Sequence, residues 1–138
     1  NTYGDGEWYH PFRSVNCTFT YKLLHGLPIV VYRGHTRTST YVYDCVNTLA
    51  NISDNFINGE VYNIGGDETC SVGDALDTLI SKSDKSFTKV LDKDRVRPTD
   101  ITLQIPDSSK FRKHFNWKPK RKLDDICNDL LKYWRSSI

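Results

Sequence analysis

Two arginines occur in contexts that suit the binding of an anion. Arg37 lies in a segment rich in threonine and tyrosine, Thr36–Tyr43, and alternation along a strand would place it on the same face as Tyr41. Arg97 directly precedes Pro98, which restricts the backbone at that point. A guanidinium group binds phosphate through two parallel hydrogen bonds. Taken alone, each arginine also fits a simpler role, on a solvated edge strand or in a surface turn.

A second candidate surface spans residues 110–122, where seven Lys or Arg residues are interleaved with aromatic ones. This mixture is typical of surfaces that bind nucleic acid. However, Phe111 and Phe115 are four residues apart and would share one buried face of a helix, while Trp117 and Pro119 are typical of a packed turn. The pattern therefore favours a solvated face, and a small nucleic-acid-binding module remains the alternative.

Motifs for cofactor or metal chemistry are missing from the sequence. There is no glycine fingerprint of a dinucleotide site or a P-loop, and none of the eight tyrosines has a lysine four residues later. The run Ile64-Gly65-Gly66-Asp67 is better explained as a turn after a strand. We assign no catalytic, cofactor-binding or metal-binding residue and expect reduced thiols, because the histidines and cysteines lack ligand spacing. The cysteines are Cys17, Cys45, Cys70 and Cys127.

The composition fits a single domain, which we expect to span residues 1–138. Hydrophobic residues make up 38% of the chain, the net charge is +2 and the mean hydropathy is -0.56. No apolar run approaches the roughly 20 residues of a membrane helix, so we expect no membrane span. Because the chain begins with Asn1 and lacks methionine, we expect further sequence upstream. The cysteine pattern favours a cytoplasmic protein.

The hydrophobic periodicity predicts an α/β fold with a parallel component. Asp44 is expected to cap the second helix, and Ser71 with Asp74 resembles a capping box before the third. Helices are expected over residues 11–24, 44–56, 72–80 and 123–134, and strands over 27–32, 36–43, 60–64, 87–91 and 101–105.

Several short motifs occur in an order that resembles one enzyme family. They are Asn1-Thr2-Tyr3-Gly4 (N-x-Y-G-P), Arg37 to Asp44 (R-x-x-x-Y-V-x-D), Val61 to Gly66 (v-Y-N-I-G-G), Arg97-Pro98-Thr99-Asp100 (R-P-x-E/D), Asp107-Ser108-Ser109-Lys110 (D-x-S-K) and Asn116-Trp117-Lys118-Pro119 (G-W-x-P). The chain is similar to the C-terminal half of the extended short-chain dehydrogenase/reductases, the NAD(P)-dependent nucleotide-sugar epimerases, dehydratases and decarboxylases. The motif Arg97-Pro98-Thr99-Asp100 most resembles that of the GDP-mannose 4,6-dehydratase branch.

The resemblance implies the substrate-binding portion of a Rossmann-type enzyme, without the N-terminal dinucleotide-binding βαβ units. It implies that Arg37 and Arg97 bind the diphosphate of a sugar nucleotide, that Asn1 bonds near the diphosphate or the sugar, and that Asp100 reaches a ribose hydroxyl. NAD or NADP would serve the intact enzyme, an isomerase or a lyase. The family's glycine-rich turn and its Tyr-x-x-x-Lys pair would precede Asn1, so this chain alone is expected to bind no cofactor and to be inactive.

The sequence departs from the family pattern at two places. Asp5 replaces the usual proline, and the Tyr32–Arg37 loop is about two residues shorter, which affects the approach of Arg37. In the family the v-Y-N-I-G-G strand belongs to the cofactor sheet, so residues 60–64 would have an unpaired edge. Such an edge favours a homodimer. A truncated fragment without independent activity is a further alternative.

Overall fold

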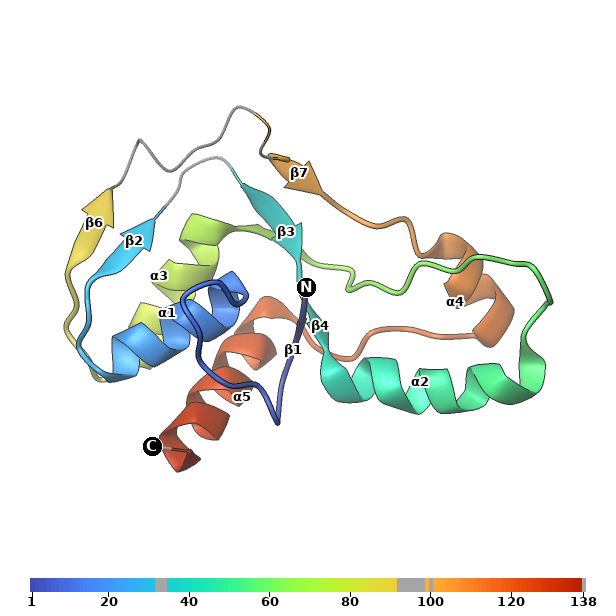
Figure 1. Cartoon of the computed structure of the whole chain (residues 1–138), viewed down its shortest axis with the longest axis horizontal. Helices are drawn as coiled ribbons and strands as arrows, with labels where there is room; N and C mark the ends of the chain where they lie inside the picture. The colour runs from blue at the N-terminus through green and yellow to red at the C-terminus, as the bar shows by residue number, and fades with distance from the viewer. Residues whose placement is uncertain (32–34, 92–98, 100, 138) are drawn as a thin grey trace.

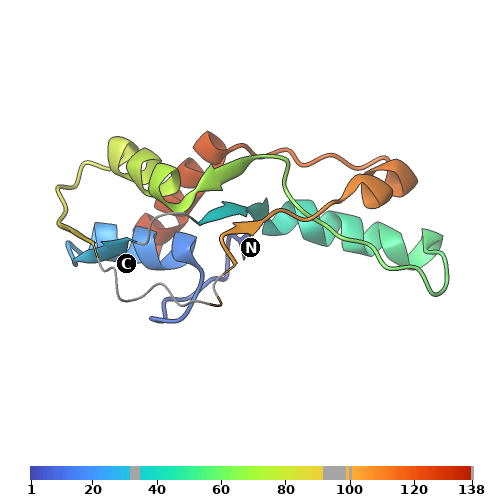
Figure 2. The same ribbon diagram turned by 90° about the horizontal axis from the view of Figure 1, so that it is seen from above.

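The chain folds into a helical body with a long arm (Figure 1). The computed structural model describes residues 1–31, 35–91, 99 and 101–137. Helices α1 (Val15–Leu24), α3 (Val72–Lys82) and α5 (Leu123–Ser136) pack together in the body. Helices α2 (Val42–Asn55) and α4 (Ser109–Phe115) form the arm, which extends away from the body in both ribbon views (Figures 1 and 2).

Short strands hold these elements together in three small sheets. Strand β1 (Thr2–Tyr3) pairs in parallel with β4 (Thr40–Tyr41), and β2 (Ile29–Val31) pairs in parallel with β6 (Lys89–Leu91). In the third sheet, β3 (Thr36–Thr38) lies between β5 (Thr69–Ser71), which is antiparallel to it, and β7 (Leu103–Gln104), which is parallel. The predicted α/β fold with a parallel component is confirmed.

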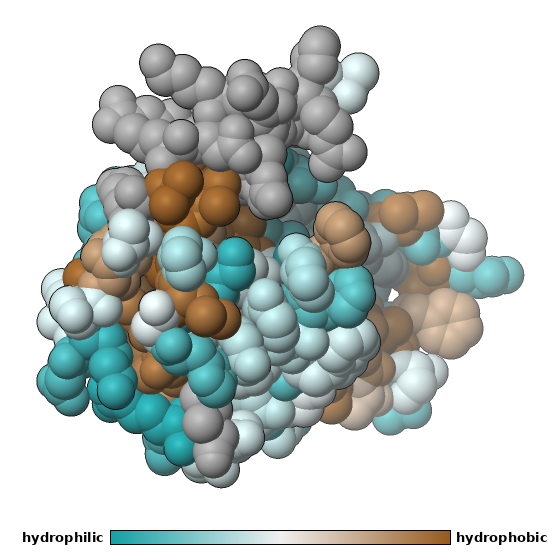
Figure 3. All heavy atoms as spheres, turned by 60° about the vertical axis from the view of Figure 1, so that its left-hand side comes forward, coloured by the Kyte–Doolittle hydropathy of each residue, from teal (hydrophilic) through white to brown (hydrophobic). Residues whose placement is uncertain are grey.

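The core forms where the apolar faces of the three body helices meet. Leu23 of α1, Leu76 of α3 and Leu131 of α5 are buried in one cluster, to which Ile29 of β2 also belongs. A second cluster joins Tyr3, Cys17 and Trp134. Burial raises the pKa of the Cys17 and Cys127 thiols to about 12, and all four cysteines are free. On the side that carries β2 and β6, hydrophobic residues are visible at the surface (Figure 3).

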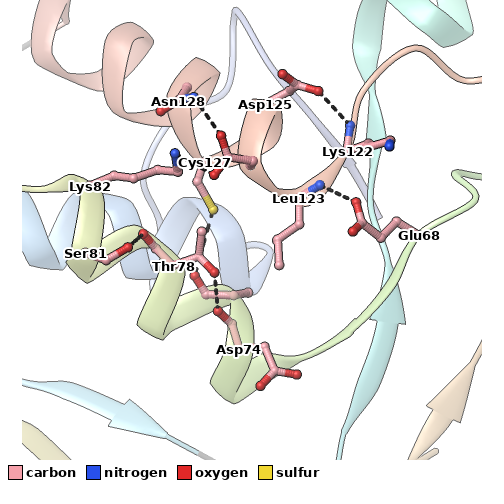
Figure 4. Close-up of polar contacts among 12 residues, drawn as sticks. Glu68, Asp74, Thr78, Ser81, Lys82, Lys122, Leu123, Asp125, Cys127 and Asn128 are labelled. Carbon is pink, nitrogen blue, oxygen red and sulfur yellow. Dashed lines mark hydrogen bonds and ion pairs between the residues drawn. The ribbon is translucent and has the colours of Figure 1, made fainter.

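The α3–α5 contact is reinforced by polar groups at the start of α5 (Figure 4). The Leu123 amide donates to Glu68 Oε2 at 2.5 Å, and the Lys122 amide donates to Asp125 Oδ2 at 3.0 Å. These carboxylates satisfy amides that have no partner inside the helix and also complement its dipole. Lys82 at the end of α3 pairs with Asp124 at 2.6 Å.

The first two predicted helices begin at different residues in the structure. Helix α1 begins at Val15 and not at Pro11, because the Ser14 side chain accepts the Cys17 amide and acts as the N-cap. Helix α2 begins at Val42, with Tyr41 as an N-cap that makes no side-chain bond. Asp44 therefore lies in the first turn of α2 and does not cap it; its side chain accepts the Lys120 amide instead.

The predicted strand over 36–43 is broken into two. Strands β3 and β4 belong to different sheets, so Arg37 and Tyr41 do not share a face of one strand. Strand β3 is also the central strand of its sheet, which rules out the edge-strand explanation of Arg37. Because the strand is broken, Arg37 on β3 lines the cleft described below, while Val42 begins α2.

The strand predicted over 60–64 does not form. The segment is irregular in the structure, and no strand of the described part of the chain pairs with it. A strand is stable only beside a hydrogen-bonding neighbour. The sheet edge on which we based a homodimer is therefore missing here, and dimerisation stays a prediction.

Candidate functional site

A cleft of about 280 Å³ lies where β1, β3 and β7 approach the segment 63–65. Asn1 and Arg37 line it together with Thr40, Asn63 and Gln104. Two of the four predicted site residues, Asn1 and Arg37, are thus brought together although they are far apart in the sequence. Arg97 and Asp100 lie outside the described residues.

The backbone of Arg37 is held on both sides by sheet pairing. It is opposite Cys70 of β5 and opposite Gln104 of β7. Its side chain is half-buried and donates to the carbonyl of Ile101 at 2.5 Å and to that of Thr36 at 3.0 Å. These bonds fix the direction of the guanidinium and engage two of its N–H groups, while an arginine has five donors. The group can therefore bind an anion without leaving its position.

Asn1 is held beside Arg37 by backbone contacts. Its backbone nitrogen donates to the Thr38 carbonyl at 3.2 Å, and its carbonyl accepts the Thr40 amide at 2.8 Å. Asn1, Thr40 and the guanidinium of Arg37 therefore line the same cleft.

The Gly65-Gly66 turn closes another side of the cleft. A side chain at Gly65 would collide with Pro106, and one at Gly66 would collide with the Ser39 carbonyl. The Gly66 amide donates to Thr40 Oγ1 at 3.0 Å in a buried contact. The glycines are therefore needed for close packing on Pro106 and Ser39, whereas the strand that was expected to precede a turn here does not form.

Sequence reasoning missed several residues that line the cleft. Asn63, whose amide donates to the Asp107 carbonyl at 3.2 Å, lies inside the Y-N-I-G-G motif, so the motif itself was the available signal. No sequence pattern indicated that Gln104 and Thr40 line the cleft. Their positions depend on the pairing of β7 with β3 and of β4 with β1, and these partners are distant in the sequence.

Three of the seven basic side chains of residues 110–122 form ion pairs within the chain. Lys110 pairs with Glu60 and Arg112 with Asp67, while Arg121 pairs with Asp129 at 2.8 Å. Phe111 is buried, in contact with the Phe115 and Trp117 rings. These contacts agree with the packed helix and turn that the sequence favoured.

No three His, Cys, Asp or Glu side chains come together as a metal site would require within 1–31, 35–91, 99 and 101–137. No helix in the described part of the chain is both long and apolar enough to cross a membrane.

The order of motifs and the α/β fold agree with the class of sugar-nucleotide enzymes that the sequence comparison identifies. The family model for GDP-mannose 4,6 dehydratase matches residues 19–130. The chain belongs to this family. Among curated proteins, none has a significant sequence match to it.

Solved structures with the same fold are more than twice as long as this chain. UDP-glucuronic acid 4-epimerase from Bacillus cereus, in complex with UDP-glucuronic acid and NAD, is 27% identical with a TM-score of 0.85; the match covers 99% of this chain and 43% of the epimerase. Pal from Bacillus thuringiensis is 25% identical with a TM-score of 0.82, covering 100% and 44%. The fold is also that of dTDP-glucose 4,6-dehydratase from Bacillus anthracis, 21% identical with a TM-score of 0.75, covering 99% and 42%.

Proposed function

We propose that this chain is the nucleotide-sugar-binding portion of an NAD-dependent epimerase or 4,6-dehydratase, with Arg37 as a ligand of the substrate diphosphate. Asn1, Arg97 and Asp100 are proposed as further substrate-binding residues. GDP-mannose is the first substrate to test, given the family. The activity of the longer protein would be that of a cytoplasmic isomerase or lyase.

The observation that carries this proposal is the position of Arg37 in the cleft. Its guanidinium is held by two backbone carbonyls, is half-buried, and has neutral hydrogen-bonding side chains beside it at Asn63 and Gln104. A guanidinium suits a diphosphate, and neutral amides suit the hydroxyls of a sugar or ribose. The similar epimerase from Bacillus cereus was solved with UDP-glucuronic acid.

This chain lacks the sequence motifs that hold and use an NAD cofactor in the family. It has no glycine fingerprint of a dinucleotide site and no tyrosine followed by a lysine four residues later. We therefore propose that the oxidation and reduction of the sugar depend on residues outside this chain, and that the residues present here bind and orient the nucleotide.

The test is to replace Arg37 in the protein that carries this chain and to measure GDP-mannose and UDP-glucuronic acid binding by titration calorimetry. Losing a charge-assisted contact to a buried phosphate costs on the order of 2 to 5 kcal/mol. Arg37→Ala should therefore weaken binding by well over tenfold. Arg37→Lys should be intermediate, because lysine keeps the charge but not the two parallel hydrogen bonds.

Arg135→Ala serves as the control. Arg135 is an exposed arginine, paired with Asp84 at 3.6 Å, and it does not line the cleft. Its replacement should leave the affinity unchanged. Equal affinity of the wild-type protein and Arg37→Ala would remove Arg37 from the site.

A further inference from the structure

Arg112 of α4 connects three groups that lie around the Gly65-Gly66 turn. Its Nε donates to Ser108 Oγ at 2.9 Å, its Nη2 donates to the Gly65 carbonyl at 3.3 Å, and its Nη1 forms an ion pair with Asp67. The guanidinium also lies 5.9 Å from the centre of the Trp117 ring. Ser108 is buried, so its hydroxyl offers a fixed partner.

These contacts reach the cleft through the residues on either side of the turn. Gly65 lines the cleft, and the next residue, Gly66, donates its amide to Thr40, which lines it too. Beyond the turn, Asp67 is held by Arg112, and Glu68 accepts the Leu123 amide at the start of α5 (Figure 4). The segment 65–68 is thus fastened between the cleft, α4 and α5.

We propose that Arg112 is a positioning residue that fixes the wall of the cleft formed by residues 63–65. The expected effect of Arg112 on nucleotide-sugar binding rests on the proposed function, whereas its positioning of residues 63–65 does not. Arg112 does not line the cleft, so it acts through the Gly65 carbonyl and Asp67 rather than by touching the substrate.

The geometry requires an arginine at this position. The three acceptors are reached by three different nitrogens of one planar group, which holds them in a fixed relation. A lysine has one nitrogen at the end of a flexible chain, so it can keep the attraction to Asp67 but not the bonds to Ser108 and Gly65 together.

The experiment compares Arg112→Gln and Arg112→Lys with the wild-type protein that carries this chain. The first readout is hydrogen exchange of the Gly66 amide, followed by NMR at a temperature where every variant is folded. We expect exchange about tenfold faster in Arg112→Gln than in the wild type, and a similar increase in Arg112→Lys, because losing the partly buried hydrogen bonds of Arg112 loosens the segment that carries Gly66. The second readout is the affinity for UDP-glucuronic acid and GDP-mannose, expected to fall about tenfold in both variants.

The matched control is Arg121→Gln. Arg121 forms an ion pair of similar exposure with Asp129, but neither residue lines the cleft. Asp67→Asn removes the ion pair but keeps both hydrogen bonds of Arg112, so it should increase Gly66 exchange less than Arg112→Gln does. This second variant keeps the test valid if Arg112→Gln fails to fold.

The outcomes separate this inference from the proposed function. If Gly66 exchange is unchanged in Arg112→Gln, or if Arg121→Gln weakens binding equally, the positioning role is wrong. If the wild-type protein binds neither sugar nucleotide while Gly66 exchange still responds to Arg112→Gln, the proposed function fails and the positioning of the turn by Arg112 stands.

Discussion

Glu7 is a buried carboxyl group next to the start of α1. One carboxylate oxygen accepts the Ser14 hydroxyl at 2.9 Å, but the other, Oε2, is buried without a hydrogen-bond partner among the described residues. Burial raises the pKa of Glu7, and the Ser14 bond and the Arg13 charge offset only part of this effect. The folded protein therefore holds a proton at Glu7 more tightly than the unfolded chain does.

This shift predicts the sign of a pH effect on stability. Because the folded-state pKa of Glu7 is raised, its contribution is fully present below the ordinary glutamate pKa of about 4.3 and is lost as the pH rises through the raised value. Thermal unfolding of wild-type protein and Glu7→Gln from about pH 4 to about pH 8 should therefore show the Tm of the wild type falling relative to that of the variant. A difference that grows in the opposite direction would show that Glu7 is stabilised as a carboxylate.

Among individual residues, the sequence predicted the site residues that belong to a family motif and missed those whose partners are distant in the sequence. Arg37 and Asn1 could be assigned because each belongs to a family motif, and the structure does place them in one cleft. Arg112 could not, because its partners Gly65 and Asp67 belong to another part of the chain. Because Arg112 is one of several basic residues in 110–122, the sequence suggested only that it carries a solvated charge.

Among the elements, α3 depends most clearly on a local signal. Ser71 Oγ accepts the Asp74 amide at 3.0 Å, and Asp74 Oδ2 accepts the Ser71 amide at 3.2 Å, so the capping box predicted from the sequence is confirmed. Ser71→Ala should lower the free energy of unfolding by about 1 kcal/mol, because it leaves the Asp74 amide without its cap. Chemical denaturation measures this change.

Ser86→Ala provides the comparison for Ser71→Ala. Ser86 is exposed in the loop after α3, so its replacement should change the free energy of unfolding by less than about 0.5 kcal/mol. Equal effects of the two substitutions would mean that the cap does not contribute to the stability of α3.

Long periodic helices were predicted closely, and strands β2, β6 and β7 form inside their predicted ranges, but β1 and β5 were missed. Helices α3 and α5 carry apolar residues at helical spacing over several turns, and both form close to where the sequence placed them. Strands β1 and β5 have only two and three residues, too few for an alternating pattern to be seen. The strand expected at 60–64 has a suitable pattern, but pairing needs a neighbour, which no local pattern reveals.

At the scale of the whole molecule, α2 turns its polar side toward the rest of the chain. The Asp44 carbonyl accepts the Trp117 indole N–H at 3.2 Å, and the Asn55 carbonyl lies 2.8 Å from a ring nitrogen of His114. Thr48 is the one buried residue of the helix. Val46 and Leu49, on the other side, are 50% and 53% exposed. A helix normally buries its apolar stripe, so this arrangement leaves unpartnered apolar surface.

Further apolar residues extend this surface beyond α2. Phe56 and Ile57 follow the helix and are also more than half exposed, and hydrophobic residues are visible on the arm at the right of Figure 3. The solved structures with this fold are more than twice as long, and a longer chain has more residues with which to cover such a face. In the 138-residue chain itself, the exposed stripe should promote association.

Replacing Val46 and Leu49 together by lysine tests this consequence. We expect the 138-residue chain to associate increasingly with concentration in light scattering and to bind a hydrophobic dye, and the double variant to do both much less. Because these side chains are exposed, each substitution should change the free energy of unfolding by less than about 0.5 kcal/mol. Asn47→Lys with Asn51→Lys adds the same charge on the polar side of α2 and should leave association nearly unchanged. If both double variants reduce association equally, net charge is the cause and the apolar stripe is not.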